Sequence, residues 1–134
     1  MILLDSSHII ALLNEEDLFH DEAIRKMDEI EKSGHSLAIS NYIVNEAVTV
    51  MLRKRGLEKA KATLDFLLNY KRLEVFHIDE NGFSEVVEEF QVQKDSLGFV
   101  DCSILWMVKR HGFGVMTFDK NLIEQIDASR KKNG

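Results

Sequence analysis

The chain has 134 residues, of which 45% are hydrophobic and 30% are charged, a composition typical of a globular protein rather than a disordered one. This length predicts one domain over residues 1–134, large enough to bury a core. A single cysteine excludes an internal disulfide, and a net charge of −6 argues against binding nucleic acid by positive charge alone. No apolar run approaches the roughly 20 residues that span a bilayer, and the first residues lack a basic signal-peptide region, so we expect a cytoplasmic protein without a membrane anchor.

Four short runs are apolar at successive positions, which is typical of strands that are buried on both faces of a parallel sheet. These runs are residues 2–4, 37–39, 75–78 and 115–118. Segments with apolar residues at helical spacing separate them, and three of these segments end at Gly34, Gly56 and Gly112. The alternation predicts an α/β fold with three layers, α/β/α, around a central parallel sheet of four strands.

Acidic residues directly follow two of the predicted strands. Asp5 follows the first strand and Asp119 follows the fourth. Ligands of open parallel sheets bind beyond the carboxyl ends of the strands, so both aspartates are candidates for a functional site. Taken singly, each is also explained as an N-cap of the helix that begins after it.

Two further acids, Glu46 and Asp101, lie on the core-facing stripes of predicted helices. Glu46 lies between Ile43 and Val50 at helical spacing, and Asp101 lies one turn before Ile104. A carboxylate on a buried stripe needs a partner, a metal ion or a water-filled cavity. The alternative to a functional role is a pairing of each acid with a nearby Lys, Arg or hydroxyl group.

The four acids are more informative together, because all of them can reach the same end of the sheet. Carboxylates in one pocket repel one another, and a divalent cation that prefers oxygen ligands removes this conflict. Mg²⁺ or Mn²⁺ fits such ligands better than Zn²⁺. The site suits hydrolysis of phosphate esters, since the cation orients and deprotonates a water and offsets charge on the phosphate oxygens.

Four segments of the sequence carry a family resemblance. They are ILLDSS (2–7), SNYIVNEAVTVMLRKRG (40–56), DSLGFVDCSILWMVKRHG (95–112) and VMTFDKNL (115–122). In order and spacing they resemble the PIN-domain family, and in particular the small toxin nucleases of the VapC type. The resemblance covers nearly the whole chain and implies a PIN-like fold.

The resemblance also implies a function, namely a metal-dependent endoribonuclease that hydrolyses RNA phosphodiester bonds with water activated by Mg²⁺ or Mn²⁺. The metal-binding, catalytic acids would be Asp5, Glu46, Asp101 and Asp119. Hydroxyl and amide groups next to them would come from Ser6, Asn41 and Thr117. The role of a further acid near the site, Asp95, stays open.

Partners follow from the same resemblance. Family members are often dimers, and toxins of this type are commonly blocked by an antitoxin, so we expect RNA as substrate, a cognate antitoxin and a homodimer. Members commonly carry a fifth strand after the T-x-D segment, but residues 122–134 show no apolar strand run. We therefore expect four strands, or five if a rudimentary one forms, and a flexible basic tail over residues 128–134.

Basic residues give weaker indications. The helix end at residues 53–55 is explained by solvation and by the helix dipole, whereas Lys109, Arg110 and Lys120 are better candidates for phosphate contacts. Two alternatives to a ribonuclease stay open: a catalytically silent PIN-like module that binds protein or takes part in RNA processing, and a metal phosphoesterase that acts on small phosphate esters.

Overall fold

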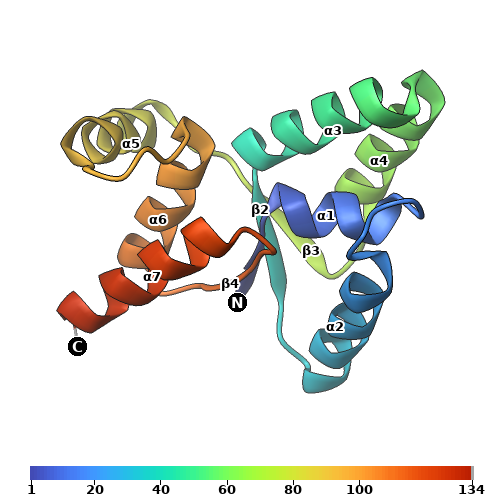
Figure 1. Ribbon diagram of the computed structural model, residues 1–134, viewed down its shortest axis with the longest axis horizontal. Coiled ribbons are helices and arrows are strands. Elements are labelled where there is room, and N and C mark those ends of the chain that lie inside the picture. Colours follow the sequence, from blue (N-terminus) through green and yellow to red (C-terminus); the bar gives the residue numbers. More distant parts are fainter. Residues whose placement is uncertain (134) are drawn as a thin grey trace.

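The computed structural model describes residues 1–133, with the side chains of residues 1–131, and places a parallel sheet between two layers of helices (Figure 1). The elements in chain order are β1 (Ile2–Leu4), α1 (Ser6–Leu13), α2 (His20–Ser33), β2 (Leu37–Ser40), α3 (Asn41–Arg55), α4 (Leu57–Asn69), β3 (Leu73–Phe76), α5 (Glu80–Val92), α6 (Phe99–His111), β4 (Gly114–Met116) and α7 (Lys120–Asn133). The predicted α/β class and the three-layer arrangement are confirmed.

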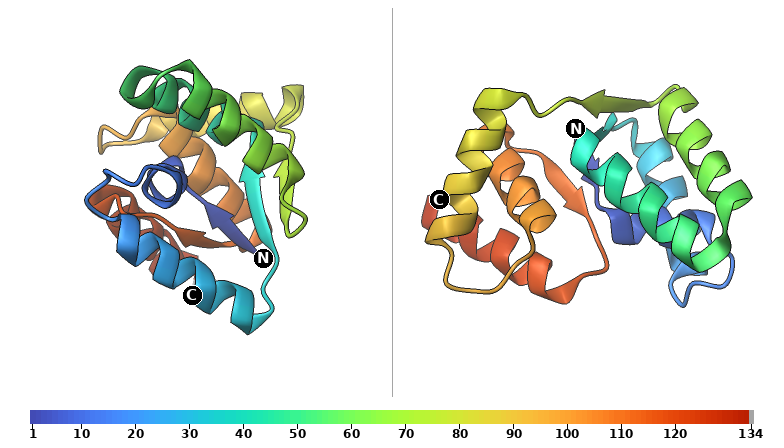
Figure 2. Two further views of the ribbon diagram at one scale, coloured as in Figure 1. Left: turned by 90° about the vertical axis from the view of Figure 1, so that its right-hand side faces the viewer. Right: turned by 90° about the horizontal axis from the view of Figure 1, so that it is seen from above.

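The order of the strands positions the functional site. It is β3-β2-β1-β4, and every neighbouring pair is parallel. The chain moves outward from β1 to β3 and then crosses back to place β4 on the other side of β1. Helices α1 to α4 accordingly cover one face and α5 to α7 the other, as the two further views show (Figure 2). The reversal at β1 and β4 is the switch point where open sheets bind ligands.

The two inner strands form the centre of the core. Leu3 and Leu4 of β1 and Leu37 and Ile39 of β2 are fully buried, although successive residues point to opposite faces of a sheet. Helices on both sides therefore cover them, and this explains why these strands are apolar at every position. Burying one such leucine side chain contributes about 1.5–3 kcal/mol.

Glycines end three of the helices as the sequence predicts, namely α2, α3 and α6, and two of these glycines lead toward a strand. Gly34 after α2 and Gly112 after α6 have φ angles of 79° and 70°, a left-handed conformation that side chains with a Cβ rarely adopt. Each glycine turns the chain directly into the segment that leads to the next strand, so these residues fix where β2 and β4 begin.

Three predicted boundaries differ from the structure. The fourth strand covers Gly114–Met116 rather than residues 115–118. The third strand covers Leu73–Phe76 rather than residues 75–78, because Leu73 pairs with Leu37 and the backbone of Ile78 bonds to a side chain instead of a strand. The last helix extends to Asn133 instead of ending near residue 128.

Contacts with the rest of the fold support this longer last helix. Ser129 is buried, and the guanidinium of Arg130 donates a hydrogen bond of 3.0 Å to the carbonyl oxygen of Phe113. Residues 128–133 of the predicted tail are therefore helical, and Gly134 lies outside the described residues. Within residues 1–133 the sheet has four strands and no fifth strand forms. None of the helices in this range combines the length and hydropathy of a membrane span.

Candidate active site

The four predicted acids come from four elements that meet at the carboxyl end of the sheet. Asp5 directly follows β1, and Asp119 lies three residues beyond β4, the neighbouring strand. Glu46 lies in the second turn of α3, and Asp101 lies in the first turn of α6. The site therefore forms at the switch point of the sheet.

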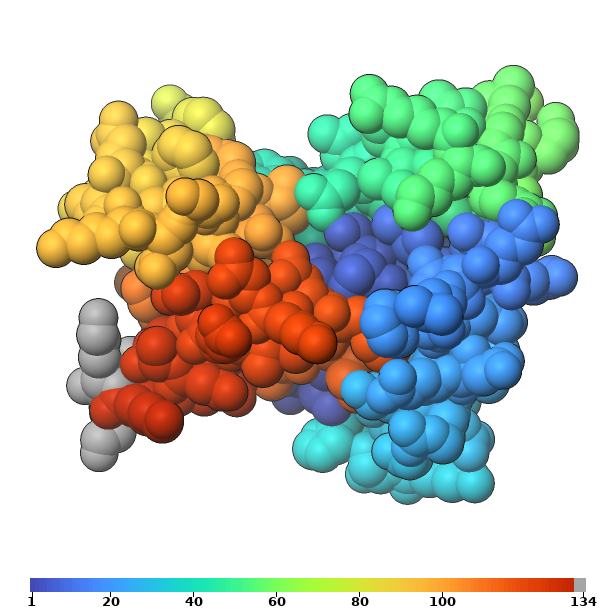
Figure 3. Space-filling model, viewed as in Figure 1, coloured from blue at the N-terminus to red at the C-terminus, as the bar shows by residue number. Residues whose placement is uncertain are grey.

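One pocket of about 450 Å³ contains all four acids. In the space-filling view, the blue start of α1 is recessed between the teal α3 and the orange segments of α6 and α7 (Figure 3). The residues that line the pocket are Asp5, Ser6, Ser7, Ile10, Asp17, Phe19, Glu46, Lys54, Asp101, Phe118 and Asp119. The sequence-based expectation that these acids reach one place is met in the structure.

Asp5 is the most buried of these acids, with 3% of its surface exposed. Its Oδ2 atom accepts hydrogen bonds from Ser7 Oγ at 2.9 Å and from Thr117 Oγ1 at 2.7 Å. Its Oδ1 atom is buried and has no hydrogen-bond partner among the described residues. A buried carboxylate oxygen without a partner is costly, so this atom is suited to bind a cation.

The same two hydroxyl groups also fix the backbone after β4. Ser7 Oγ accepts a hydrogen bond from the amide of Phe118 at 3.0 Å, and Thr117 Oγ1 accepts one from the amide of Asp119 at 3.0 Å. Hydroxyl groups can donate and accept at once. Ser7 and Thr117 therefore hold the Asp5 carboxylate and the backbone that carries Asp119 in one fixed arrangement.

Glu46 and Asp119 are held in different ways. The hydroxyl of Ser6 donates a hydrogen bond to Glu46 Oε1. Asp119 Oδ1 accepts from the amides of Asn121 at 2.9 Å and Leu122 at 3.3 Å, so this oxygen caps α7. The interpretation of Asp119 as a helix cap is confirmed for one oxygen, and its Oδ2 makes no hydrogen bond within the described part of the chain. By contrast, the Asp5 side chain makes no capping hydrogen bond to α1.

Burial and the neighbouring negative charges raise the pKa of Asp101 from 3.8 to about 6. Desolvation is the largest cause, followed by the charges of Asp5, Asp119 and Glu46, while a hydrogen bond from the Gly98 backbone opposes the shift. A carboxylate whose pKa depends on three others lies close to all of them. The charges of the other three acids therefore act on Asp101.

The chemistry of these groups fits a hard divalent cation. The acids offer oxygen atoms alone, and the lining residues include one cationic side chain, Lys54. Within residues 1–131, no three His, Cys, Asp or Glu side chains lie close enough together to hold one ion as they stand. Rotation of the carboxylates toward one another would be needed for a shared ligand shell.

Three other predicted residues have different surroundings. Ser6 and Thr117 contact predicted metal-binding acids, whereas Asn41 does not line the pocket. The Asn41 amide pairs with the backbone of Ile78, accepting from its nitrogen at 2.8 Å and donating to its oxygen at 3.4 Å. The structure therefore gives Asn41 the task of joining the start of α3 to the segment after β3.

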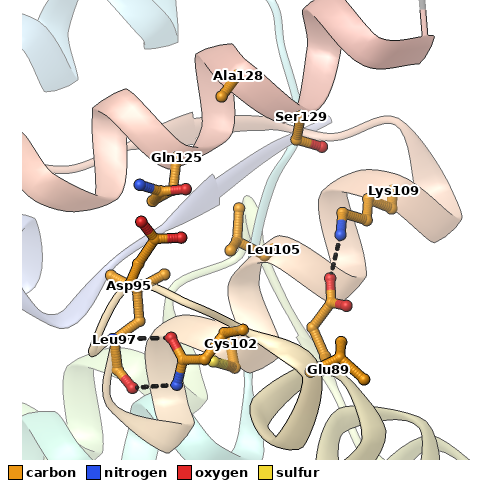
Figure 4. Close-up of a pocket in the computed structure, with 11 residues that line it drawn as sticks. Glu89, Asp95, Leu97, Cys102, Leu105, Lys109, Gln125, Ala128 and Ser129 are labelled. Carbon is orange, nitrogen blue, oxygen red and sulfur yellow. Dashed lines mark hydrogen bonds and ion pairs between the residues drawn. The ribbon is translucent and has the colours of Figure 1, made fainter.

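Asp95 is separated from the four acids. It lines another pocket, of about 340 Å³, where its carboxylate points toward Gln125 of α7 (Figure 4). Lys109 lines the same pocket and pairs with Glu89, and Arg110 lines a third one. These basic residues do not line the acidic pocket, although the sequence made them the better candidates for phosphate contacts.

Sequence reasoning missed or undervalued six residues of the pocket, among them Ile10 and a fifth acid, Asp17. Ser7, rather than its neighbour Ser6, bonds to Asp5, and Lys54 reaches the pocket from the last turns of α3. Phe19 and Phe118 line the pocket as well. A usable indication was present for Phe118, which lies between Thr117 and Asp119 in the predicted site segment.

Comparisons with known proteins agree with this geometry. The family described as PIN domain matches residues 2–128. No curated protein sequence matches the chain.

Solved structures with the same fold include the sarcin-ricin loop-cleaving toxin VapC20 of Mycobacterium tuberculosis. That structure has a TM-score of 0.82 at 22% identity, with 93% of this chain and 95% of that chain covered. FitAcB from Neisseria gonorrhoeae has a TM-score of 0.64 at 18% identity, covering 95% and 94% of the two chains. VapBC2 from Rickettsia felis, bound to a DNA fragment of its promoter, has a TM-score of 0.68 at 18% identity, covering 92% of each.

Proposed function

The chain belongs to the PIN domain family, and on this basis we propose that it is a metal-dependent endoribonuclease that hydrolyses RNA phosphodiester bonds. The observation that carries the proposal is the convergence of Asp5, Glu46, Asp101 and Asp119 on one pocket in which Asp5 Oδ1 is buried without a partner. Carboxylates gathered in this way can serve as cation ligands. Among the residues that line the pocket, Lys54 is the one basic side chain that could offset their negative charge.

Asp5, Glu46, Asp101 and Asp119 would hold the cation, and the all-oxygen ligand set favours Mg²⁺ or Mn²⁺. When bound, such a cation supplies an activated water for attack on phosphorus and offsets the charge that develops on the phosphate oxygens.

The remaining residues of the site prepare the acids for this task. Ser7 and Thr117 hold one oxygen of Asp5, and the other is buried without a hydrogen-bond partner within the described residues. Ser6 orients Glu46, and the amides at the start of α7 orient Asp119. Lys54 makes no ion pair within residues 1–131, so its ammonium group is available to a phosphate of the RNA.

We further propose that the protein is the toxin of a toxin–antitoxin pair and works as a homodimer in the cytoplasm. Its fold is that of VapC20, VapBC2 and FitAcB, which supports a partner protein that blocks the acidic pocket. Exposed apolar side chains of α5, Phe83, Phe90 and Val92, support self-association. Light scattering of the purified chain tests the dimer, and a monomer over the micromolar range would contradict it.

Cleavage of single-stranded RNA tests the enzymatic proposal. We expect cleavage with Mg²⁺ or Mn²⁺, none in EDTA, and a loss of at least about 100-fold in Asp5→Asn and Asp101→Asn, since each removes a charged cation ligand. Asp95→Asn is the matched control, because this exposed acid lines a different pocket. Equal activity in the two site variants would contradict the proposal.

Two results would favour the alternatives. Turnover of a generic phosphate ester without RNA cleavage indicates a small-molecule phosphoesterase. Absence of both Mn²⁺ binding and cleavage indicates a silent module.

A further inference from the structure

Two aromatic rings form a parallel stack at the rim of the acidic pocket. The rings of Phe19 and Phe118 lie 4.7 Å apart between centroids with an interplanar angle of 6°. Both line the pocket, and 40% of the Phe19 surface is exposed. Phe118 covers one face of the Phe19 ring, and no other aromatic ring within the described residues stacks on Phe19. The stack therefore offers an aromatic surface beside the carboxylates.

The base of the stack is fixed to the active site. Phe118 lies between Thr117 and Asp119, and its amide donates to Ser7 Oγ at 3.0 Å. The ring of His8, fully buried, stacks against Phe118 with centroids 5.6 Å apart, and the ammonium group of Lys26 lies 5.0 Å from the centre of the Phe118 ring. Phe118 therefore cannot leave its place without disturbing the groups that hold Asp5.

The outer ring is also held in place, although it belongs to a loop residue. The amide of Phe19 donates to Asp17 Oδ1 at 2.9 Å, and its carbonyl oxygen accepts from the amide of Ala23 at 2.8 Å. The imidazole of His20, the next residue, bonds to the carbonyl oxygen of Ala11 at 2.7 Å. A ligand that stacks on Phe19 would meet a ring that is already oriented.

We propose that Phe19 binds an unpaired nucleobase of the RNA, stacked on the ring and next to the phosphate that the acidic pocket receives. The inference rests on the proposed nuclease function and adds a positioning residue to it. Unpaired bases commonly stack on aromatic side chains, at about 1–3 kcal/mol for each base. A stack of this kind selects single-stranded or loop RNA, because a paired base has no free face.

The position of the rings favours a nucleobase over a protein side chain. The stack shares one pocket with five carboxylates, Asp17 among them, and with Lys54, so a ligand on Phe19 lies within reach of both the acids and a cation that can bind phosphate. A base and its own phosphate present this combination of a flat apolar group and a negative charge. The pocket is lined by several acids and the chain has a net charge of −6, so overall charge does not attract RNA. Stacking on Phe19 would supply affinity for RNA that electrostatic attraction does not.

A binding experiment in EDTA separates stacking from cleavage. Single-stranded RNAs of 12 nucleotides carry the fluorescent base 2-aminopurine at successive positions, and its fluorescence falls when it stacks. We expect the wild-type protein to quench one or two adjacent positions. Phe19→Leu should abolish this quenching and raise the Kd about 5- to 150-fold, the equivalent of one stacked base. Phe19→Trp should restore both, because it retains an aromatic face.

Leu18 provides the matched control, since it precedes Phe19, is 90% exposed and does not line the pocket. We expect Leu18→Ala to bind RNA like the wild type. With Mn²⁺, Phe19→Leu should raise KM for RNA with little change in kcat. Unchanged quenching and unchanged KM in Phe19→Leu would overturn the inference and point to a protein contact at this loop. If wild-type protein cleaves no RNA, the proposed function fails, and the EDTA measurement still decides the stacking by itself.

Discussion

Thr117 Oγ1 donates a hydrogen bond of 2.7 Å to Asp5 Oδ2, which joins two residues 112 positions apart in the sequence. Because Asp5 follows β1 and Thr117 follows β4, the bond closes the carboxyl ends of two neighbouring parallel strands. The second oxygen of Asp5 has no hydrogen-bond partner within the described residues. The predicted cation site depends on this bond as much as on the acids themselves.

Replacement of Thr117 by valine tests this dependence. Thr117→Val keeps the shape of the side chain but removes the donor to Asp5 and the acceptor for the Asp119 amide. We expect Mn²⁺ affinity to fall about 10- to 100-fold, the usual effect of losing a group that orients a metal ligand. Calorimetric titration measures this. Thr63→Val is the control, because Thr63 is equally buried but bonds within α4, and equal Mn²⁺ affinities in the two variants would contradict the prediction.

Asp101 should reduce the stability of the metal-free protein above its pKa. The pKa of Asp101 is raised to about 6 in the folded state, so the folded protein binds this proton more tightly than the unfolded chain. The free energy of unfolding therefore falls as pH rises from about 4 to 6 and stays lowered above that range. In EDTA at pH 7.5 we expect Asp101→Asn to raise the free energy of unfolding by on the order of 1 kcal/mol.

Thermal unfolding in EDTA checks this gain, which should vanish at pH 4, where the wild-type carboxyl is protonated. Added Mn²⁺ should then stabilise the wild type and not the variant. Asp95→Asn, at an exposed acid outside the pocket, should show neither effect. A variant that is no more stable than the wild type at pH 7.5 would refute the electrostatic coupling of the four acids.

His8 should make the free energy of unfolding fall as the pH is lowered, which is opposite to the effect of Asp101. Burial, with a smaller effect of Lys26, lowers the pKa of His8 to about 4, and neither ring nitrogen has a hydrogen-bond partner within the described residues. The unfolded chain takes up the proton near pH 6.5 and the folded protein does not, so stability is lost as pH falls from 6.5 to 4. The loss attributable to His8 should reach about 3 kcal/mol.

His8→Phe removes the titrating group, and with it this pH-dependent loss of stability, and keeps an aromatic ring against Phe118. Urea unfolding at pH 5 and pH 7.5 measures the difference between variant and wild type, which should favour the variant more at pH 5. His35→Phe, at an exposed position, serves as the control. If the difference is the same at both pH values, His8 is not buried as a neutral ring.

Asn41 should affect stability and leave cation binding unchanged. The side-chain amide of Asn41 bonds to the backbone N–H and C=O of Ile78, as a neighbouring strand would. Asn41→Ala leaves the half-buried N–H of Ile78 without this partner. We expect a loss of about 1–3 kcal/mol in the free energy of unfolding. Asn69→Ala, which removes an exposed bond within α4, should cost less. A fall in Mn²⁺ affinity of Asn41→Ala beyond tenfold would instead assign Asn41 to the site.

Much of the fold could be predicted because its determinants are local. Leu3 and Leu4 are buried on opposite faces of β1, so the short run that they form marks an inner parallel strand without any knowledge of its neighbours. Gly34 and Gly112 end helices through their own backbone conformation. Asp5 was found because it follows a strand directly, and the carboxyl ends of parallel strands meet at one edge.

The parts that sequence reasoning missed depend on contacts between distant segments. Ser6 and Ser7 are adjacent and chemically identical, and only the position of Thr117 makes Ser7 the partner of Asp5. Lys54 reaches the pocket because α3 passes beside α1, which no pattern within α3 indicates. The length of α7 depends in the same way on the bond from Arg130 to Phe113.

The pairing of β1 with β4 has a consequence for biosynthesis. Asp5 precedes Thr117 by 112 positions, and within residues 1–133 the strand that brings Thr117 and Asp119 beside Asp5 comes last in the chain. A growing chain that stops before β4 lacks Asp119, and its Asp5 lacks the hydrogen bond from Thr117. Under the proposed function, a growing chain would therefore lack a complete set of acids until β4 and the segment after it have been made.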